Sequence, residues 1–244
     1  MSHSSEIYVL GKKVRLLQPE KGFRTSIDSV LVAAACPVKS GQHVLDMGCG
    51  VGAVGFCILQ RVSGVAVTGI DIQKEHLALA HENAVLNNVL SFISFQHCDI
   101  REFTAGERFD HVVCNPPFLE AGQHIPSPEE GVALARGHGT HDITIKDWVD
   151  AGFRNLKPGG SLSLIHRADA TDRILQALGK RFGAVEIIPL WPRAGVAAKR
   201  VIIRALKDRK SPAILNAGLV LHKEDGCYTQ EVDLILRNAV SLFS

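Results

Sequence analysis

The sequence predicts an α/β protein with a Rossmann-like, doubly wound fold, built on a mostly parallel seven-stranded sheet with an antiparallel edge strand. Apolar strand-like runs alternate with helical segments along most of the chain, which is typical of a parallel sheet covered on both faces. A glycine-rich loop joins the first of these strands to the helix after it. The chain has 244 residues, 46% hydrophobic and 21% charged, which suits one large α/β domain.

The order of these segments assigns each element. We expect strands at 43–47, 65–72, 92–97, 111–114, 161–166, 185–190 and 200–205, and helices at about 26–36, 51–62, 74–87, 143–156 and 171–181. A turn is expected at 157–160. Residues 191–199 contain Pro192 and Gly195 and no helical pattern, and a connection this short favours an antiparallel hairpin at the sheet edge.

The chain divides into three sections: an N-terminal segment over 1–40, a core over 41–210, and an extension over 211–244 packed on that core. The extension is expected to contain an edge segment and a short C-terminal helix. Within the core, the stretch from Pro116 to about His141 is punctuated by glycine and proline and has no periodicity. Loops of this length are usually functional or disordered.

Composition excludes some classes of protein. No apolar run is long enough to cross a bilayer, and Met1 to Leu10 lacks a secretory signal pattern, so we expect a cytoplasmic protein with no membrane contact. The six cysteines include no CxxC pair, which favours buried free thiols over disulfides or zinc ligands.

Overall charge does not identify a partner, because the formal net charge is only +2. Its distribution is more informative, since basic residues cluster towards the C-terminus at Arg193, Lys199, Arg200, Arg204, Lys207, Arg209 and Lys210. This cluster is either a solvated face or a nucleic-acid-binding patch.

A rigid tip follows the strand at 111–114. Asn115, Pro116, Pro117 and Phe118 come directly after this apolar run. The two prolines donate no backbone hydrogen bond, and Pro116 restricts Asn115 to extended conformations. The tip presents an amide oxygen that can accept a hydrogen bond from an NH2 group, and a ring that can stack on a flat partner. We interpret it as a site for a planar amine.

The loop after the first strand has the features of a nucleoside site. Gly48, Gly50 and Gly52 allow the backbone to approach a ligand closely, and Asp71 at the end of the next strand can accept hydrogen bonds from ribose hydroxyls. A literal GxGxxG at Gly50, Gly52 and Gly55 also raises the possibility of a nicotinamide dehydrogenase. Asp46 argues against it, because a carboxylate ahead of the glycines would repel a pyrophosphate and suits a ligand with a positive group.

With Asp46, the glycines, Asp71 and the 115–118 tip in this order, the chain resembles the class I S-adenosylmethionine-dependent methyltransferases. Among these it is similar to the bacterial tRNA(Val) adenine-N6 methyltransferase family. The resemblance extends from Gly22 to Tyr228, and residues 22–31 look like that family's cofactor-covering segment. Section 1–40 would then carry the cofactor-covering helix, and section 41–210 would be the catalytic core.

The resemblance implies a role for each matching residue. The residues implied to bind S-adenosylmethionine are Asp28, Asp46, Gly48, Gly50, Gly52, Asp71, Ile72, Asp99 and Ile100, and those implied to act in catalysis are Asn115, Pro116, Pro117 and Phe118. Asp46 would lie near the cofactor's amino group, Asp71 at its ribose and Asp99 at its adenine. Asp28 would help close the methionine end. Many relatives have Thr where this chain has Ile27, so Thr25 or Ser26 would have to supply the hydroxyl.

The remaining candidates have simpler explanations. His138, His141 and Asp142 suggest a metal site, but glycines interrupt them and no further ligand has suitable spacing, so we expect no metal. His166 and Arg167 end a strand at the edge where the tip lies.

The predicted function is transfer of a methyl group from S-adenosylmethionine to an exocyclic amine, foremost adenine N6 in tRNA. Two other acceptors stay open: a glutamine side chain of a protein, methylated at N5, and guanine N2 in rRNA. The short N-terminal segment disfavours the protein substrate. A third alternative, from a different class, is a non-catalytic RNA-binding module. The expected partner is RNA, with tRNA foremost.

Overall fold

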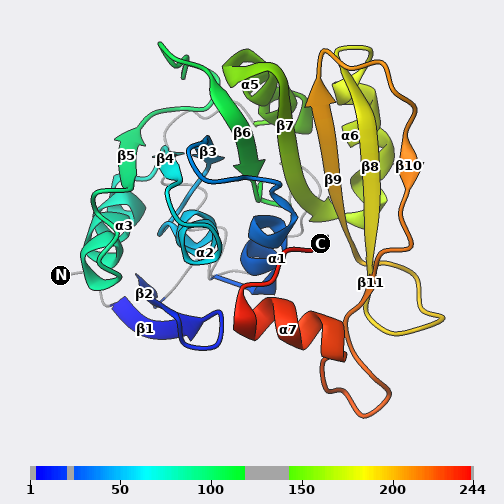
Figure 1. Cartoon of the computed structure of the whole chain (residues 1–244), viewed down its shortest axis with the longest axis horizontal. Coiled ribbons are helices and arrows are strands. Elements are labelled where there is room, and N and C mark those ends of the chain that lie inside the picture. Colours follow the sequence, from blue (N-terminus) through cyan, green and yellow to red (C-terminus); the bar gives the residue numbers. More distant parts are fainter. Residues whose placement is uncertain (1–3, 21–24, 119–142, 243–244) are drawn as a thin grey trace, which may run out of the picture.

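The structure is a computed structural model that describes residues 4–20, 25–118 and 143–242. Its main sheet is mostly parallel, as predicted. Its strands are β3 (His43–Met47), β4 (Ala66–Asp71), β5 (Ile93–His97), β6 (Phe109–Cys114), β7 (Leu156–Arg167), β8 (Phe182–Trp191), β9 (Arg200–Lys207), β10 (Ile214–Leu215) and β11 (Leu219–Val220). Across the described residues their order is β10-β8-β9-β7-β6-β3-β4-β5, with β11 also paired to β8. β9 runs antiparallel to its two neighbours, and the other pairs are parallel (Figure 1).

The predicted fold class is confirmed, but the sheet has nine strands in the described residues where seven were predicted. All seven predicted strands are present, and the hairpin at the sheet edge is β8–β9. β9 is the inner strand of that hairpin, while the two-residue strands β10 and β11 pair with β8 on its outer side. The turn expected at 157–160 is instead part of β7. Gly159 has a φ of +76° there, and the pairing with β6 shifts register between Phe109 and His111.

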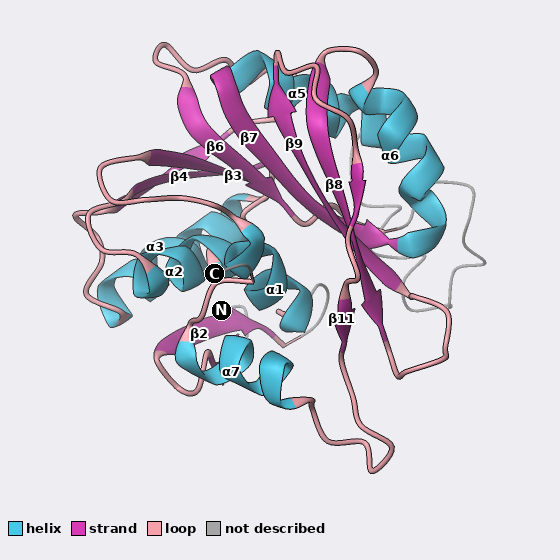
Figure 2. Ribbon diagram, turned by 45° about the vertical axis from the view of Figure 1, so that its right-hand side comes forward, coloured by secondary structure: helices cyan, strands magenta, loops and turns pink. Residues whose placement is uncertain are grey.

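Helices cover both faces of the sheet (Figure 2). They are α1 (Ile27–Ala35), α2 (Ala53–Arg61), α3 (Lys74–Leu86), α5 (Ile145–Asn155), α6 (Thr171–Leu178) with the short 3-10 helix η1 (Ala168–Ala170) before it, and α7 (Gln230–Asn238). α1, α2 and α7 contribute to one buried apolar cluster, and α5 and α6 contribute to a second. Polar side chains cap the start of three of these helices: Ser26 at α1, Thr144 at α5, where it forms a capping box with Asp147, and Thr229 at α7.

An N-terminal hairpin, which the sequence analysis did not predict, packs beside α3. It consists of β1 (Ser4–Val9) and β2 (Val14–Pro19). Asn83 of α3 joins the two elements, since its Oδ1 accepts a hydrogen bond from Leu17 N at 2.7 Å and its Nδ2 donates to Leu17 O at 2.9 Å. The division of the chain at residues 40 and 210 stays a proposal, and side chains from all three sections share one buried cluster.

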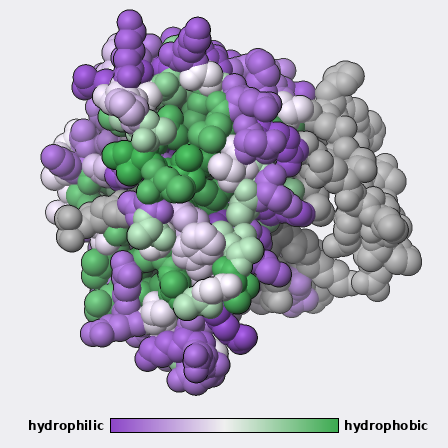
Figure 3. Space-filling view, turned by 90° about the vertical axis from the view of Figure 1, so that its right-hand side faces the viewer, coloured by the Kyte–Doolittle hydropathy of each residue, from purple (hydrophilic) through white to green (hydrophobic). Residues whose placement is uncertain are grey.

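The surface and the cysteines add three observations. Apolar side chains gather on the face at the β8–β10 edge of the sheet (Figure 3), where Ile214 and Leu215 are 57% and 75% exposed. Four of the six free cysteines are buried as expected, whereas Cys98 is half-buried and Cys227 is exposed. Within the described ranges, no helix combines the length and apolar character needed to cross a membrane.

Candidate active site

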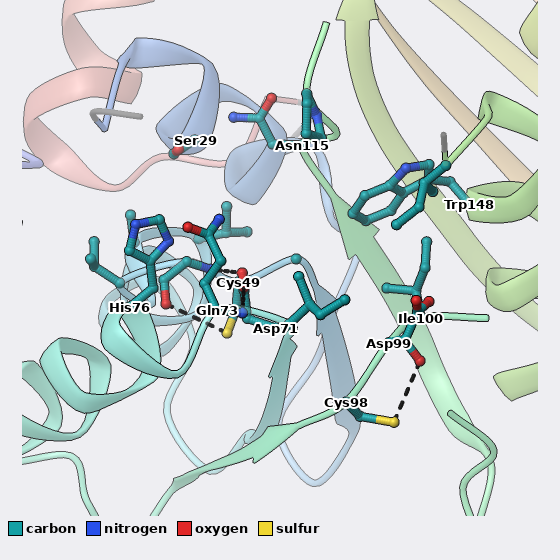
Figure 4. A pocket seen from close by; sticks show the side chains of 18 of the residues that line it. Ser29, Cys49, Asp71, Gln73, His76, Cys98, Asp99, Ile100, Asn115 and Trp148 are labelled. Carbon is teal, nitrogen blue, oxygen red and sulfur yellow. Dashed lines mark hydrogen bonds between the residues drawn. The ribbon is translucent and has the colours of Figure 1, made fainter. Parts of the chain in front are cut away.

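A cavity of about 260 Å³ opens where β3, β4, β5 and β6 end at their C-terminal side (Figure 4). β3 pairs with β4 on one side and with β6 on the other, so the chain changes direction across the sheet at this point. Ligands of doubly wound proteins bind in the crevice at such a switch point. The predicted residues that line the cavity are Gly48, Gly50, Asp71, Ile72, Asp99, Ile100, Asn115 and Pro117.

The glycine loop forms the floor of this cavity and is tied to β4. The backbone N–H groups of Gly48 and Cys49 both donate to Ile70 O, at 2.8 and 3.0 Å. Gly48 has a φ of +66°, and a Cβ on it would lie 2.5 Å from Cη2 of Trp148. Gly50 has a φ of +54°, but a Cβ there would meet no atom within 4 Å. The first glycine therefore makes room for an indole ring, while the second borders open space.

Asp71 holds the glycine loop while it faces the cavity. Its Oδ2 accepts a hydrogen bond from Gly50 N at 2.8 Å, and its Oδ1 accepts one from Gln73 N at 2.8 Å. Each carboxylate oxygen has a second lone pair, so two further hydrogen bonds from a ligand remain possible. Gln73 and His76, which follow at the start of α3, also line the cavity, as Figure 4 shows.

Asp46 lies beneath the glycine loop and is not among the residues that line the cavity. It is 1% exposed, and its Oδ2 accepts a hydrogen bond from Gly55 N at 3.2 Å. Burial raises the pKa of this carboxyl from 3.8 to about 8, because the charged form loses hydration. Gly55 lies inside α2 and Gly52 caps that helix, so the last two glycines of the literal GxGxxG belong to the helix start.

The wall formed by residues after β5 contains Asp99 and Ile100. The Asp99 carboxylate accepts hydrogen bonds from Arg101, with Nη2 to Oδ2 at 2.5 Å and the Arg101 backbone N to Oδ1 at 2.8 Å. The Arg101 guanidinium holds the pKa of this carboxyl below its usual value. Asp99 is therefore a charged hydrogen-bond acceptor at the cavity, and Arg101 already occupies some of its acceptor positions.

The Asn-Pro-Pro-Phe tip stands at the end of β6, as its sequence predicts. Asn115 is half-buried and lines the cavity together with the exposed Pro117, while Pro116 is buried. The Oδ1 atom of Asn115 is itself buried and accepts no hydrogen bond from the described residues. A buried acceptor without a donor costs about 1–3 kcal/mol, so few such atoms persist without a role.

Phe118 lies against two neighbouring strands instead of lining the cavity. His166, the penultimate residue of β7, meets the Phe118 ring edge-on, with centroids 5.3 Å apart and planes at 77°. The guanidinium carbon of Arg200, at the start of β9, lies 4.4 Å from the Phe118 ring centre. The sequence indicated that His166 ends a strand at this edge, and the structure brings it into contact with the tip.

The segment before the first strand of the sheet supplies α1. Asp28 is buried in its first turn, is not among the cavity-lining residues, and forms an ion pair with Arg200 at 3.2 Å. The Ser26 hydroxyl accepts a hydrogen bond from Asp28 N as the helix cap. Thr25 and Ser29 line the cavity, so Thr25 is the hydroxyl available where relatives carry one at position 27.

Trp148 is the main cavity residue that sequence reasoning missed. It comes from α5, follows the 119–142 stretch, and its ring lies near Asn115 and Ile100 in Figure 4. No local pattern singles out one aromatic residue on an amphipathic helix as a cavity wall. The position of Gln73 and His76 could have been predicted, because both follow Asp71 at the turn from a strand to a helix.

Several other predicted residues can now be placed. His138, His141 and Asp142 lie outside the described residues, as do residues 22–24 of the segment that resembles the cofactor cover. In the described parts of the chain, no group of three His, Cys, Asp or Glu side chains is arranged to hold a metal ion.

The basic cluster does not form one face. Arg204 binds Glu186 at 2.6 Å, and Lys207 donates to Phe153 O and Leu156 O at 2.8 Å. With Arg200 paired to Asp28, three of the seven basic residues are engaged inside the fold. Arg193 and Lys199 are exposed in the connection between β8 and β9, and Lys199 directly precedes β9. Arg209 and Lys210 are exposed beyond its other end.

Comparison with known proteins gives a consistent assignment. Residues 25–129 match the family model described as the methyltransferase small domain. A tRNA1(Val) (adenine(37)-N6)-methyltransferase of Flavobacteriaceae bacterium (strain 3519-10) is 30% identical over 221 residues, which span 90% of this chain and 92% of that protein. The protein of the same name from Glaesserella parasuis is 25% identical over 211 residues, spanning 85% of this chain and 86% of the relative.

A solved structure has the same overall fold. The crystal structure of a predicted O-methyltransferase, protein Atu636 from Agrobacterium tumefaciens, is 25% identical, with a TM-score of 0.71. The match covers 88% of this chain and 98% of that protein. The chain therefore belongs to the S-adenosylmethionine-dependent methyltransferases, in the family of the tRNA1(Val) (adenine(37)-N6)-methyltransferases.

Proposed function

We propose that this enzyme transfers a methyl group to an exocyclic amine, and that the amine is N6 of an adenine in tRNA. The observation that carries the proposal is the buried Oδ1 of Asn115, a residue that lines the cavity, because this atom accepts no hydrogen bond from the described residues. An NH2 group is one donor that such an acceptor can bind. The curated relatives are named for adenine-N6 methylation, which agrees with this acceptor.

The residues of the tip explain how an amine becomes reactive. An aromatic NH2 is a poor nucleophile, because its lone pair is delocalised into the ring. A hydrogen bond from this group to Asn115 Oδ1, and a second one to the Pro116 carbonyl, would favour a tetrahedral nitrogen and free the lone pair. The rigid prolines fix the direction of both bonds. Most of the rate acceleration would then come from orientation rather than from a general base.

The cavity residues fit S-adenosylmethionine, which when bound supplies an electrophilic methyl group on a sulfonium. Asp71 has acceptor capacity left for ribose hydroxyls, and Ile72 and Ile100 line the same cavity with apolar surface for a flat base. Asp99 is a charged acceptor at the wall after β5. We assign these residues to the nucleoside half of the cofactor. We assign a second set to the methionine end, either in contact with it or supporting the residues that contact it: Asp28, Asp46, Gly48, Gly50 and Gly52.

An RNA partner is supported by the positive charge in the connection between β8 and β9. Arg193 and Lys199 are exposed, and neither forms an ion pair with another described residue. Lys199 directly precedes Arg200, whose guanidinium lies on the Phe118 ring at the tip. Positive side chains at this position would contact phosphates while the base enters the site. We infer that the protein works in the cytoplasm, where tRNA is modified.

The experiment that tests the proposal follows labelled methyl groups from S-adenosylmethionine into the tRNA and into the proteins of an extract from cells that lack this enzyme. We expect label that is released by ribonuclease and retained after protease treatment, and we expect Asn115→Ala to abolish most of it. Label that protease releases would instead indicate glutamine-N5 methylation of a protein. No label with either substrate, together with no binding of S-adenosylhomocysteine, would favour the non-catalytic RNA-binding module and overturn the proposal.

A further inference from the structure

We propose that Arg200 is a positioning residue that holds the Phe118 ring in place and ties it, through Asp28, to the helix beside the cofactor cavity. The inference rests on the proposed function, because it gives Phe118 the task of receiving the acceptor base. It also changes the expectation for Asp28, which would act through Arg200 rather than by contacting the cofactor.

The Arg200 guanidinium makes three contacts that fix its plane. Its Nε donates to Asp28 Oδ2 at 3.2 Å, its Nη1 donates to Lys199 O at 3.2 Å, and its Cζ lies 4.4 Å from the centre of the Phe118 ring. The side chain is 33% exposed and its Asp28 partner is 10% exposed. A cation over an aromatic face contributes about 0.5–2 kcal/mol, with the larger values at desolvated sites.

Two strands therefore hold Phe118 from different directions. Arg200 covers one face of the ring, and His166 packs against the ring in a T-shaped arrangement with an interplanar angle of 77°. His166 pairs with Val201 across β7 and β9, so both contacts come from one place in the sheet. A base that stacks on Phe118 would therefore use a face that Arg200 does not cover. The contact thereby determines where the base lies relative to Asn115.

The ion pair between Arg200 and Asp28 connects the tip to α1, which lies beside the cofactor cavity. Asp28 lies in the first turn of α1, between Thr25 and Ser29, which both line the cavity. Arg204 lies on the same face of β9, four residues along, and donates to Ala35 O at the C-terminal end of α1. Thus β9 holds α1 at both ends, and the arginine at the N-terminal end also contacts the tip.

The test is a double-mutant cycle between Arg200→Gln and Phe118→Leu, measured as kcat/KM for tRNA with the full-length protein. We expect Arg200→Gln to lower kcat/KM for tRNA about tenfold in the wild-type background and less than twofold in the Phe118→Leu background. The KM for S-adenosylmethionine should change less than threefold. Arg209→Gln removes a positive charge beyond the other end of β9, away from Phe118, and it should change kcat/KM less than threefold in both backgrounds.

Arg200→Lys keeps a cation near both partners but loses the flat guanidinium, so it should recover part of the lost activity. This variant also keeps the test valid if Arg200→Gln fails to fold. Equal factors for Arg200→Gln in both backgrounds would overturn the inference, as would equal losses of kcat/KM with Arg209→Gln. If the wild type methylates another acceptor, the proposed function fails but the same cycle can be run with that acceptor.

A readout independent of activity is the ¹⁹F resonance of fluorophenylalanine placed at position 118. We expect this resonance to shift or broaden with Arg200→Gln and to stay unchanged with Arg193→Gln. An unchanged resonance in Arg200→Gln would show that the guanidinium does not hold the ring, and would overturn the inference whatever the substrate is.

Discussion

Asp46 and the Oδ1 atom of Asn115 are two buried polar groups at this site, and they differ in the hydrogen bonds that the fold gives them. Asp46 accepts a backbone hydrogen bond from Gly55 and has a pKa raised to about 8. The Asn115 Oδ1 has no donor among the described residues. The first group is therefore costly to keep charged, and the second is costly to keep without a ligand. Both costs are expected at a site whose polar groups await a partner.

Asn115→Ala should lower kcat by about 10²–10³-fold, by analogy with the removal of one preorganised hydrogen-bonding group from a reaction centre. The affinity for S-adenosylhomocysteine should change less than threefold, because the lost hydrogen bond belongs to the acceptor. Single-turnover methylation and calorimetry measure the two quantities. A kcat within twofold of wild type would show that the amide does not act on the amine.

In the absence of ligand, Asp46→Asn should raise the free energy of unfolding, by an amount that depends on pH. Because the folded pKa is raised, the folded state keeps a proton that the unfolded chain releases between pH 3.8 and about 8. The stability of the wild type therefore falls as pH rises through this window and stays low above it. The asparagine variant has no such loss.

Thermal melting between pH 4 and pH 9 measures this effect. The melting temperature of Asp46→Asn should exceed that of wild type by a margin that grows up to pH 8, at about 2–4 °C for each kcal/mol in a chain of this size. A margin that is the same at every pH would contradict the raised pKa.

At the scale of elements, the site depends on the packing of the glycine loop against α5. Gly48 and Gly50 both have positive φ, but only a Cβ on Gly48 would strike Trp148, at 2.5 Å. Gly48→Ala should therefore weaken S-adenosylhomocysteine binding at least tenfold more than Gly50→Ala, which has comparable backbone strain and no clash. Calorimetry on both variants gives the comparison.

A second substitution that removes this clash should restore binding of S-adenosylhomocysteine. Trp148→Phe removes the indole atoms that a Cβ on Gly48 would meet, so it should restore part of the affinity in a Gly48→Ala background. If the two glycine variants bind equally, or if Trp148→Phe gives no recovery, the loop is not held by the indole.

Sequence reasoning succeeded for elements with strong local signals. Strands ending in Asp71 and Asn115 could be predicted because apolar runs stop there at polar residues or prolines. The β1–β2 hairpin was missed, because its stability comes from contacts such as those of Leu17 with Asn83, 66 residues away. Trp148 was missed for the same reason: its place in the cavity depends on how α5 packs on the loop.

At the scale of the whole molecule, the sheet separates residues that are close in sequence and joins others that are distant. Arg200 and Lys207 begin and end one strand, so the basic cluster is divided between opposite edges of the sheet. In contrast, Asp28 and Arg200 are 172 residues apart and form an ion pair. The sequence alone thus overstated the basic patch and could not reveal the contact between Asp28, Arg200 and Phe118.

The division of charge predicts which edge contacts RNA. Replacing Arg193 and Lys199 by Glu should raise the KM for tRNA at least tenfold and lower the salt dependence of binding, because phosphate contacts are lost. The matched pair Arg209→Glu and Lys210→Glu, which places the same charge change beyond the opposite end of β9, should alter the KM less than threefold. Equal effects at the two ends would show that RNA is attracted by overall charge and not by the site edge.

The most direct test of the central claim is mass spectrometry of nucleosides from unmodified tRNA transcripts after incubation with the enzyme and S-adenosylmethionine. The account predicts N6-methyladenosine as the product with wild type, and its formation at least about 100-fold more slowly with Asn115→Ala. A product methylated at guanine N2, or N6-methyladenosine formed equally fast without the Asn115 amide, would contradict it.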